Sequence, residues 1–261
     1  MAKAAVSQTQ RSKRVAAVLE QMYGTPAKPR GRSNPLDTLI ATLLSQNTND
    51  RNSYRAWLNL KKQFPTWDSV VSAPVAAVAR SIEVGGLKNQ KAQRIRKILK
   101  AIRAERGSFE LDFLRAMPDD AALRYLQQMK GVGTKTAACV LVFSLGRDVF
   151  PVDTHIHRIC NRLGLVKTRN ADQTYELMKF LTPKGMSYPF HVNLIRFGRE
   201  ICRSGKPFCG SCQFFDECAF GEKVRFSQNH LPADGTGSEK SKFLITEEVS
   251  RARHRRTSTG A

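Results

Sequence analysis

At 261 residues, with 41% hydrophobic residues, the chain is long enough for one large domain or two small ones with a substantial core. Its net charge of +21, from 43 Lys and Arg against 22 Asp and Glu, opposes folding by self-repulsion and indicates a polyanionic partner, most simply nucleic acid. No apolar run reaches the roughly 18 residues that span a bilayer and the N-terminus lacks a secretory signal, which argues against a membrane protein and places the six cysteines in a reducing compartment.

The positive charge is not confined to the ends of the chain. Residues 1–35 carry +6 and residues 221–261 carry +3, which leaves +12 for the segment between them. We therefore expect a basic folded surface as well as basic tails. A ribosome- or RNA-associated protein also fits the charge, so charge alone does not select DNA.

Several helices are predicted in the first third of the chain, because apolar residues recur there at intervals of three and four. Asn34 and Pro35 have the sequence of a helix start, and Asp50 is expected to cap the helix that follows. Pro65 ends that helix. The predicted helices cover 11–23, 35–44, 51–64 and a single short helix around 70–78.

A basic amphipathic helix follows the turn Gly85-Gly86-Leu87, with its apolar face marked by Ile95, Ile98, Leu99 and Ile102. The remaining charged residues predict a solvated face that could also lie near phosphates: Lys91, Arg94, Lys97, Lys100 and Arg103. Further helices are predicted at about 119–126, 135–145, 154–162, 171–181 and 189–201. No stretch shows the period-two alternation of a strand, so the predicted fold class is all-α.

The stretch Gly131-Val132-Gly133 predicts a tight hairpin between two helices, with positive φ available at both glycines. The helix that follows would present unpaired N–H groups at its N-terminus. Such a site suits a DNA phosphate and gives contacts that do not depend on base sequence. A Gly-x-Gly turn by itself is a weak signal, because helix pairs joined by a glycine-containing turn are common.

Lys135 lies in the first turn of that helix, where the helix dipole and a basic cleft are expected to lower its pKa. A neutral amine is a nucleophile that can attack the C1′ of a sugar and form a Schiff base, whereas a charged lysine here would bind phosphate. Asp153 comes 18 residues later and is expected to be a helix N-cap. If its carboxylate also faces Lys135, it can deprotonate the amine or stabilise a cationic sugar.

Four cysteines with the spacing C-x6-C-x2-C-x5-C close the folded part of the chain: Cys202, Cys209, Cys212 and Cys218. Four thiolates suit zinc or an iron–sulfur cluster, and the spacing does not choose between them. Lys206 belongs to a basic stretch between these cysteines that could touch phosphates. Cys139 and Cys160 lie on apolar helices and are expected to pack in the core.

Taken together, these features resemble the endonuclease III family of base-excision DNA glycosylases over roughly residues 11–220. The matching motifs are Gly131-Val132-Gly133-Thr134-Lys135-Thr136-Ala137, Val152-Asp153-Thr154-His155 and the four-cysteine spacing. The gap of 18 residues between Lys135 and Asp153 matches as well.

The resemblance implies two all-helical lobes, a helix-hairpin-helix motif and a [4Fe–4S] cluster held by the four cysteines. Residues 37–147 would form a six-helix lobe, and residues 11–36 with 148–220 the cluster lobe. Damaged double-stranded DNA would lie in the groove between them with the damaged base flipped out. Residues 1–10 and 221–261 are expected to be disordered tails.

By the same resemblance, Lys135 is the Schiff-base nucleophile and Asp153 its acidic partner in a bifunctional DNA glycosylase and AP lyase that removes oxidised pyrimidines. Asn47, with Gln46 beside it, falls where the family has a glutamine that fills the gap left by the flipped base; this shorter amide is a departure that could alter substrate range. Leu87 matches the family's apolar wedge. The remaining DNA-contact candidates are Lys130, Gly131, Gly133, Thr136, His155 and Lys206.

Two alternatives stay open. One is an adenine-type monofunctional glycosylase, which shares the cluster and aspartate but lacks the lysine and has a further C-terminal domain. The other is a non-catalytic, cluster-bearing DNA-binding module. The presence of both Lys135 and Asp153 favours the bifunctional enzyme. We expect a monomer in the cytoplasm of a bacterium, associated with the nucleoid.

Overall fold

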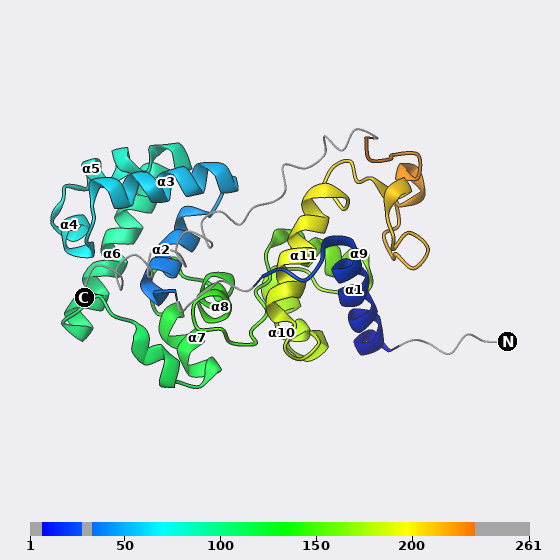
Figure 1. The fold of residues 1–261 in the computed structure, drawn as a ribbon, viewed down its shortest axis with the longest axis horizontal. Helices are drawn as coiled ribbons and strands as arrows, with labels where there is room; N and C mark the ends of the chain where they lie inside the picture. The colour runs from blue at the N-terminus through cyan, green and yellow to red at the C-terminus, as the bar shows by residue number, and fades with distance from the viewer. Residues whose placement is uncertain (1–6, 28–32, 233–261) are drawn as a thin grey trace. The chain divides into compact units, whose positions relative to one another are not determined.

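The computed structural model describes residues 7–27 and 33–232. Within these residues the chain forms eleven α-helices and four short 3-10 helices with no strand, which confirms the all-α prediction (Figure 1). In the same described segments, every helix is too short or too polar to cross a membrane.

The described residues divide into two compact units, 7–27 with 148–232 and 33–147. In the 33–147 unit, helix α2 packs against α3, α6 and α8, and every residue of α2 except Asp37 is buried. The α-helices of this unit are α2 (Pro35–Leu44), α3 (Asp50–Gln63), α4 (Trp67–Ser72), α5 (Val75–Ser81), α6 (Lys88–Arg106), α7 (Asp119–Gln127) and α8 (Thr134–Phe143). Two 3-10 helices, η1 (Glu83–Gly85) and η2 (Asp112–Ala116), precede and follow α6.

Local sequence explains where these helices begin and end. The Asn34 side chain accepts hydrogen bonds from the amides of Leu36 and Asp37, and Pro35 occupies the first helical position, as predicted. The cap of α3 is Asn49, so the prediction that Asp50 caps it is wrong by one residue.

The single short helix expected around 70–78 is instead two helices, α4 and α5. Pro74 separates them, because the residue before a proline is pushed out of the helical region, and Ala73 is extended with ψ 150°.

The second unit is built around α11 (Ser187–Glu200), which packs against α1 (Gln8–Tyr23) and α9 (Thr154–Arg162). Helix α10 (Ala171–Leu181) covers α9. The buried ring of Phe197 on α11 meets the ring of Phe214 edge-on, with 5.3 Å between their centroids. This contact joins the helical core to the segment 202–218, which we call the cysteine loop and which contains η3 (Cys209–Ser211).

Both predicted tails are partly structured. Helix α1 begins at Gln8, inside the expected tail 1–10, because Ser7 and Gln10 form a capping box. Beyond the cysteine loop, residues 221–232 include η4 (Val224–Phe226) and pack on that loop, with Gly210 N donating to Asn229 O over 3.0 Å. The remaining parts of these two predicted tails, 1–6 and 233–261, lie outside the described residues.

Candidate functional site

The predicted hairpin joins α7 to α8. Val132 N donates to Met129 O over 3.0 Å and closes the turn. Gly131 has φ +88°, which requires glycine, whereas Gly133 has φ −90° and ψ 179°, so only one of the two glycines uses positive φ. Gly133 is the N-cap of α8 with no side-chain cap, and the space where its Cβ would lie is empty. The N-terminus of α8 is therefore open to an anion.

Arg94 of α6 links the hairpin to the loop after α2. A Cβ on Gly131 would lie 2.7 Å from Cζ of Arg94, so the guanidinium packs directly on the glycine. The same guanidinium donates to Oε1 of Gln46 over 2.9 Å, and Nε2 of Gln46 donates to the hydroxyl of Thr136 over 3.2 Å. Thr136 is buried, so its side chain contacts protein, and Gln46 is held by two partners beside the exposed Asn47.

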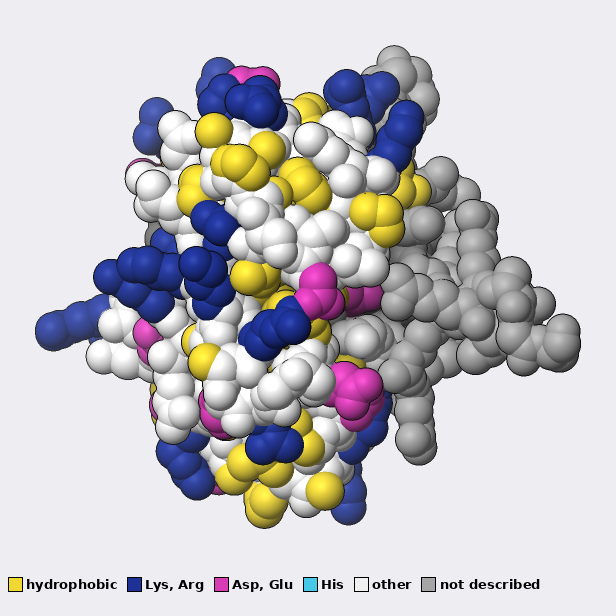
Figure 2. All heavy atoms as spheres, turned by 90° about the vertical axis from the view of Figure 1, so that its left-hand side faces the viewer, with side chains coloured by type: hydrophobic (Ala, Val, Ile, Leu, Met, Phe, Trp, Pro, Cys, Tyr) yellow, Lys and Arg dark blue, Asp and Glu magenta, His cyan; other side chains and the backbone are white. Residues whose placement is uncertain are grey.

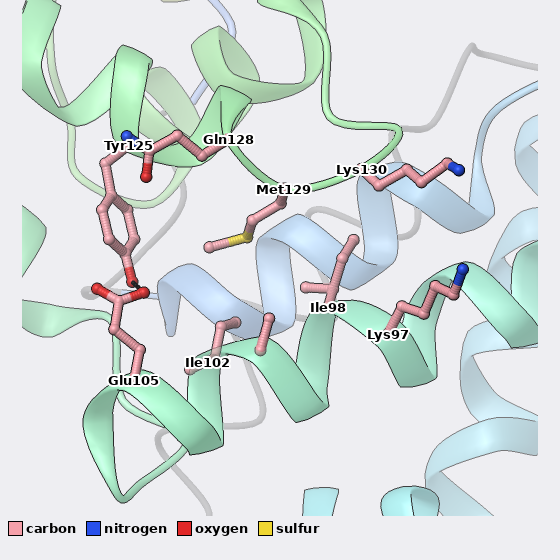
Figure 3. Close-up of a pocket in the computed structure, with 9 residues that line it drawn as sticks. Lys97, Ile98, Ile102, Glu105, Tyr125, Gln128, Met129 and Lys130 are labelled. Atoms are coloured by element: carbon pink, nitrogen blue, oxygen red, sulfur yellow. Dashed lines mark hydrogen bonds between the residues drawn. The ribbon is translucent and has the colours of Figure 1, made fainter.

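A pocket of about 240 Å³ lies beside the hairpin, between α6 and α7 (Figure 3). Ile98, Ile102 and Met129 form its apolar lining, and the hydroxyl of Tyr125 donates to Glu105 at one end. At the other end stand Lys97 and Lys130, which also line a neighbouring hollow together with Gln90, Gln93 and Arg94. Several cations therefore gather beside the hairpin.

The basic character extends over the 33–147 unit. Figure 2, which views the molecule from the side of α4 and α5 in Figure 1, shows several groups of Lys and Arg side chains with few Asp or Glu among them. Basic side chains arranged in this way suit a polyanionic partner.

The two candidate catalytic residues sit at helix N-termini. Lys135 is the second residue of α8 and is half-buried. Asp153 caps α9 as predicted, with Oδ1 accepting from Ile156 N over 2.9 Å. One oxygen of the Asp153 carboxylate thus fixes its position, and its side chain is only partly buried.

Asn47 and Leu87 share a backbone conformation. They are the only non-glycine residues in 7–27 and 33–232 with positive φ, at 52° and 48°. Both side chains are exposed, and 48% of Leu87 is accessible, which is high for a large apolar residue. Asparagine adopts the left-handed conformation more readily than most residues, whereas a left-handed leucine is unusual and needs support from its surroundings.

The prediction that Lys91 lies on a solvated face is wrong. Lys91 is 4% exposed, and its Nζ donates to Leu44 O and Gly85 O, each over 2.8 Å. Burial, with a contribution from Arg94, lowers the pKa of Lys91 to about 8. The helical spacing indicates the burial of Lys91, since positions 91, 95 and 98 follow the i, i+4, i+7 pattern of the apolar face.

The four cysteines of the cysteine loop line one pocket with apolar walls that include Leu163, Phe197 and Ile201. All four are free thiols, and burial raises the pKa of Cys212 to about 12, with the neighbouring cysteines adding to the shift. No three His, Cys, Asp or Glu side chains in the described segments converge as ligands of a single ion. A cubane cluster takes one thiolate on each of four irons, so this donor set and its shared pocket fit such a cluster.

Two arginines of α9, which sequence analysis did not single out, hold the cysteine loop. Arg158 donates to Cys202 O and to Gly198 O, and Arg162 donates to Arg203 O over 2.8 Å. The carbonyl of Arg162 in turn accepts from the Cys218 thiol over 3.1 Å. The two arginines supply hydrogen-bond donors to backbone carbonyl oxygens that have no partner from regular secondary structure.

Of the remaining candidates, His155 is half-buried, with Nη2 of Arg158 3.2 Å from its Nδ1, and a Cβ on Gly198 would lie 3.1 Å from that same nitrogen. Burial lowers the pKa of His155, which favours the neutral imidazole. Lys206 is exposed on the cysteine loop.

Comparison with known proteins agrees with this architecture. Residues 40–184 match the model of the HhH-GPD superfamily of base excision DNA repair proteins. Endonuclease III of Thermotoga maritima is 35% identical over 188 residues, which cover 72% of this chain and 84% of that protein. An Arabidopsis thaliana protein named "Putative DNA glycosylase" is 40% identical over 172 residues, which cover 66% of this chain but only 58% of the relative.

The fold matches solved structures too. A non-covalent Endonuclease III–DNA complex superposes with a TM-score of 0.72 at 25% identity, covering 84% of this chain and 99% of that one. The hairpin, the all-helical units and the matched length point the same way. The chain therefore belongs to the endonuclease III family of helix-hairpin-helix base excision DNA repair proteins.

Proposed function

We propose that this protein is a bifunctional DNA glycosylase and AP lyase that removes oxidised pyrimidines from duplex DNA and then cuts the strand by β-elimination. The observation that carries the proposal is Lys135 at the second position of α8, directly behind the hairpin, in a chain of this family. We further propose that it acts as a monomer on chromosomal DNA in the bacterial cytoplasm, in keeping with relatives in Thermotoga maritima and Escherichia coli.

In this mechanism the neutral amine of Lys135 attacks C1′ of the damaged nucleotide. The electrons of the N-glycosidic bond leave with the base, which takes up a proton, and the sugar ring opens to an imine between C1′ and Lys135. Loss of a C2′ proton then breaks the C3′–O bond and cuts the strand. Hydrolysis of the imine returns the lysine.

Asp153 supplies the negative charge in this scheme. The hydrogen bond from the Ile156 amide holds the Asp153 carboxylate in place. The carboxylate therefore need not reorganise when positive charge develops on the sugar. It can stabilise the cationic sugar or take the proton from the Lys135 ammonium before attack.

The remaining candidates divide into phosphate and duplex contacts. The open N-terminus of α8, with Gly131, Gly133 and Lys130, is suited to a phosphate of the backbone. The exposed side chains of Asn47 and Leu87 are suited to entering an opened duplex, Asn47 in the gap left by the flipped base and Leu87 as a wedge. His155 and Lys206 are proposed as further contacts from the other unit.

We also propose that Cys202, Cys209, Cys212 and Cys218 hold a [4Fe–4S] cluster. The support is the four-thiol donor set in one apolar pocket, in a chain of this family. When bound, the cluster supplies four iron–thiolate bonds that tie the cysteine loop together.

A thymine-glycol duplex tests the function. The full chain should release the base and cut the strand, and borohydride should trap a covalent enzyme–DNA adduct. Lys135→Gln should bind the lesion but neither cut nor trap, because glutamine is similar in length but cannot form an imine. Base release without cutting or trapping would indicate a monofunctional glycosylase, and binding without base release would indicate a non-catalytic module.

A further inference from the structure

Lys91 joins two segments that are far apart in sequence. Its Nζ donates to the carbonyl oxygens of Leu44 and Gly85, 2.8 Å away in each case. Leu44 ends α2 and Gly85 ends η1, so both carbonyls lie at helix C-termini, where partial negative charge favours a cation. With 4% of Lys91 exposed, water does not compete for these bonds.

Each of these two anchor points lies just before one of the two residues proposed to enter DNA. Leu44 precedes Asn47 by three residues, and Gly85 precedes Leu87 by two. The backbone amide of Lys91 also donates to Leu87 O over 3.0 Å. One residue thus bonds to the turn carrying Leu87 on both sides of Gly86 and to the start of the loop carrying Asn47.

The left-handed backbone of Leu87 in particular calls for such a support. Asn47 and Leu87 are the two left-handed non-glycine residues of the described segments, and their exposed side chains contribute little packing of their own. A strained backbone persists only where surrounding bonds over-determine it. The side chain of Lys91 supplies hydrogen bonds to both supporting segments.

We infer that Lys91 is a positioning residue that fixes the spacing between the loop of Asn47 and the turn of Leu87, and so sets the preference for damaged over intact duplex. The inference rests on the proposed function for its DNA readout and on geometry alone for its structural half. A wedge and a gap-filling amide act on one opened base pair only if their separation matches it, so loss of the common anchor should weaken damage-specific binding selectively.

Burial of an ammonium makes a merely space-filling role a poor account of this residue. Burial lowers the pKa of Lys91 to about 8, so the charged group is held against its solvation preference. An apolar side chain would fill the same volume without that cost but would leave both carbonyls unpaired.

The structural half is tested by amide hydrogen exchange on the full chain without DNA. In Lys91→Met, which keeps the length of the side chain and removes its donors, exchange in 45–49 and in 85–88 should rise together by about tenfold or more, while the hairpin 128–134 stays protected. Lys62→Met, an exposed lysine of α3 in the same unit, is the matched control and should change neither segment. Unchanged exchange in the two loops of Lys91→Met would overturn the inference.

The DNA half is tested by a mutant cycle on damaged and intact duplex. Lys91→Met should weaken damaged-duplex binding by about tenfold or more and intact-duplex binding by less than about twofold. In the Asn47→Ala/Leu87→Ala background the same substitution should cost under about twofold, because Lys91 acts through those residues. Equal loss on both duplexes, or full additivity in that background, would assign Lys91 to general stability instead.

A second variant keeps the test decisive if Lys91→Met does not fold. Lys91→Gln keeps a donor but is too short to reach both carbonyls, and it should show the same selective loss to a smaller degree; loss on intact duplex alone would contradict the inference. The exchange result does not depend on catalysis. If wild-type protein fails to process thymine glycol, the proposed function fails, whereas coupled loosening of the two loops still supports the anchor.

Discussion

Nε and Nη2 of Arg158 donate to the carbonyl oxygen of Cys202 over 3.1 and 2.8 Å, which fastens helix α9 to the first cysteine of the cysteine loop. Asp153 caps the N-terminus of the same helix, five residues before Arg158. The proposed catalytic carboxylate and the proposed cluster ligands therefore depend on one helix of nine residues. Disturbing one of these two contacts of α9 should affect the other.

Arg158→Met should reduce iron retention and stability together. It removes charged donors from two carbonyls, those of Cys202 and Gly198, at a cost of about 1.5–3 kcal/mol for a hydrogen bond to a charged group. Iron content per chain and the thermal unfolding midpoint measure the effect. Arg203→Met is the comparison and should change both less, because it removes one hydrogen bond, from Nε to Arg199 O, and a stacking contact with the Phe208 ring.

Asp153→Asn should separate helix capping from chemistry. The amide oxygen can still accept from Ile156 N, so the free energy of unfolding should stay within about 0.5 kcal/mol of wild type. Base release should slow by roughly 10²–10⁴-fold, since the charge is lost. Asp153→Ala should add a capping loss of about 1 kcal/mol. Single-turnover kinetics measure base release. A normal rate in Asp153→Asn would show that Asp153 acts only as a helix cap.

Cys212→Ser should lower both iron content and folded yield. The purified wild-type protein should be yellow-brown and contain about four irons per chain, the complement of a [4Fe–4S] centre. Loss of one ligand should destabilise the cysteine loop, which otherwise packs on the helical core through the contact of Phe214 with Phe197. Cys139→Ala, a buried cysteine of α8, is the control and should keep its iron. A colourless protein with one zinc would contradict the cluster.

Binding to undamaged duplex should fall steeply with salt, with a log–log slope near −0.9 for each neutralised phosphate. Lys130→Gln, beside the open N-terminus of α8, should make that slope shallower by about 0.9. Lys62→Gln on the exposed face of α3 should leave it nearly unchanged. Equal changes in the two variants would show diffuse attraction without a phosphate site at the hairpin.

The pKa of Lys91 predicts a pH dependence of stability. The folded-state pKa, about 8, lies below the ordinary value of 10.5, so between these pH values the unfolded chain holds a proton that the folded chain has released. The free energy of unfolding therefore gains a contribution that rises with pH across this window. Denaturant unfolding of wild type and Lys91→Met at pH 7.5 and 10 should show their difference growing in favour of wild type. A constant difference would place the pKa elsewhere.

The sequence predicted helices best where a local signal decides them. Asn34-Pro35 and Asp153 each specify a helix start through their own side chains, and both were predicted correctly. The capping box of Ser7 and Gln10 is equally local, but the small and polar residues around it favour a disordered tail. Pro74 also acts locally, and its effect on Ala73 explains why one expected helix is two.

The contacts that organise the candidate site are of another kind. Lys91 bonds to Leu44 across 47 residues, and Arg158 bonds to Cys202 across 44, so neither partner could be chosen before the helices were packed. Lys91 continues the apolar face at helical spacing, but lysine is so rarely buried that its charge favours the solvated face. The tertiary environment, which supplied two carbonyl acceptors, decided the outcome.

The close packing of Arg94 on Gly131 ties two positions of the sequence to each other during divergence. The φ of +88° strongly disfavours other residues at position 131, and a Cβ there would also have to displace the Arg94 guanidinium. Even if the backbone at 131 changed its φ, a larger residue there would need a smaller side chain at 94. A smaller residue at 94 would lose the hydrogen bond to the Gln46 amide. Relatives that lack glycine at this place should therefore also lack arginine at 94 and should carry a different residue at 46.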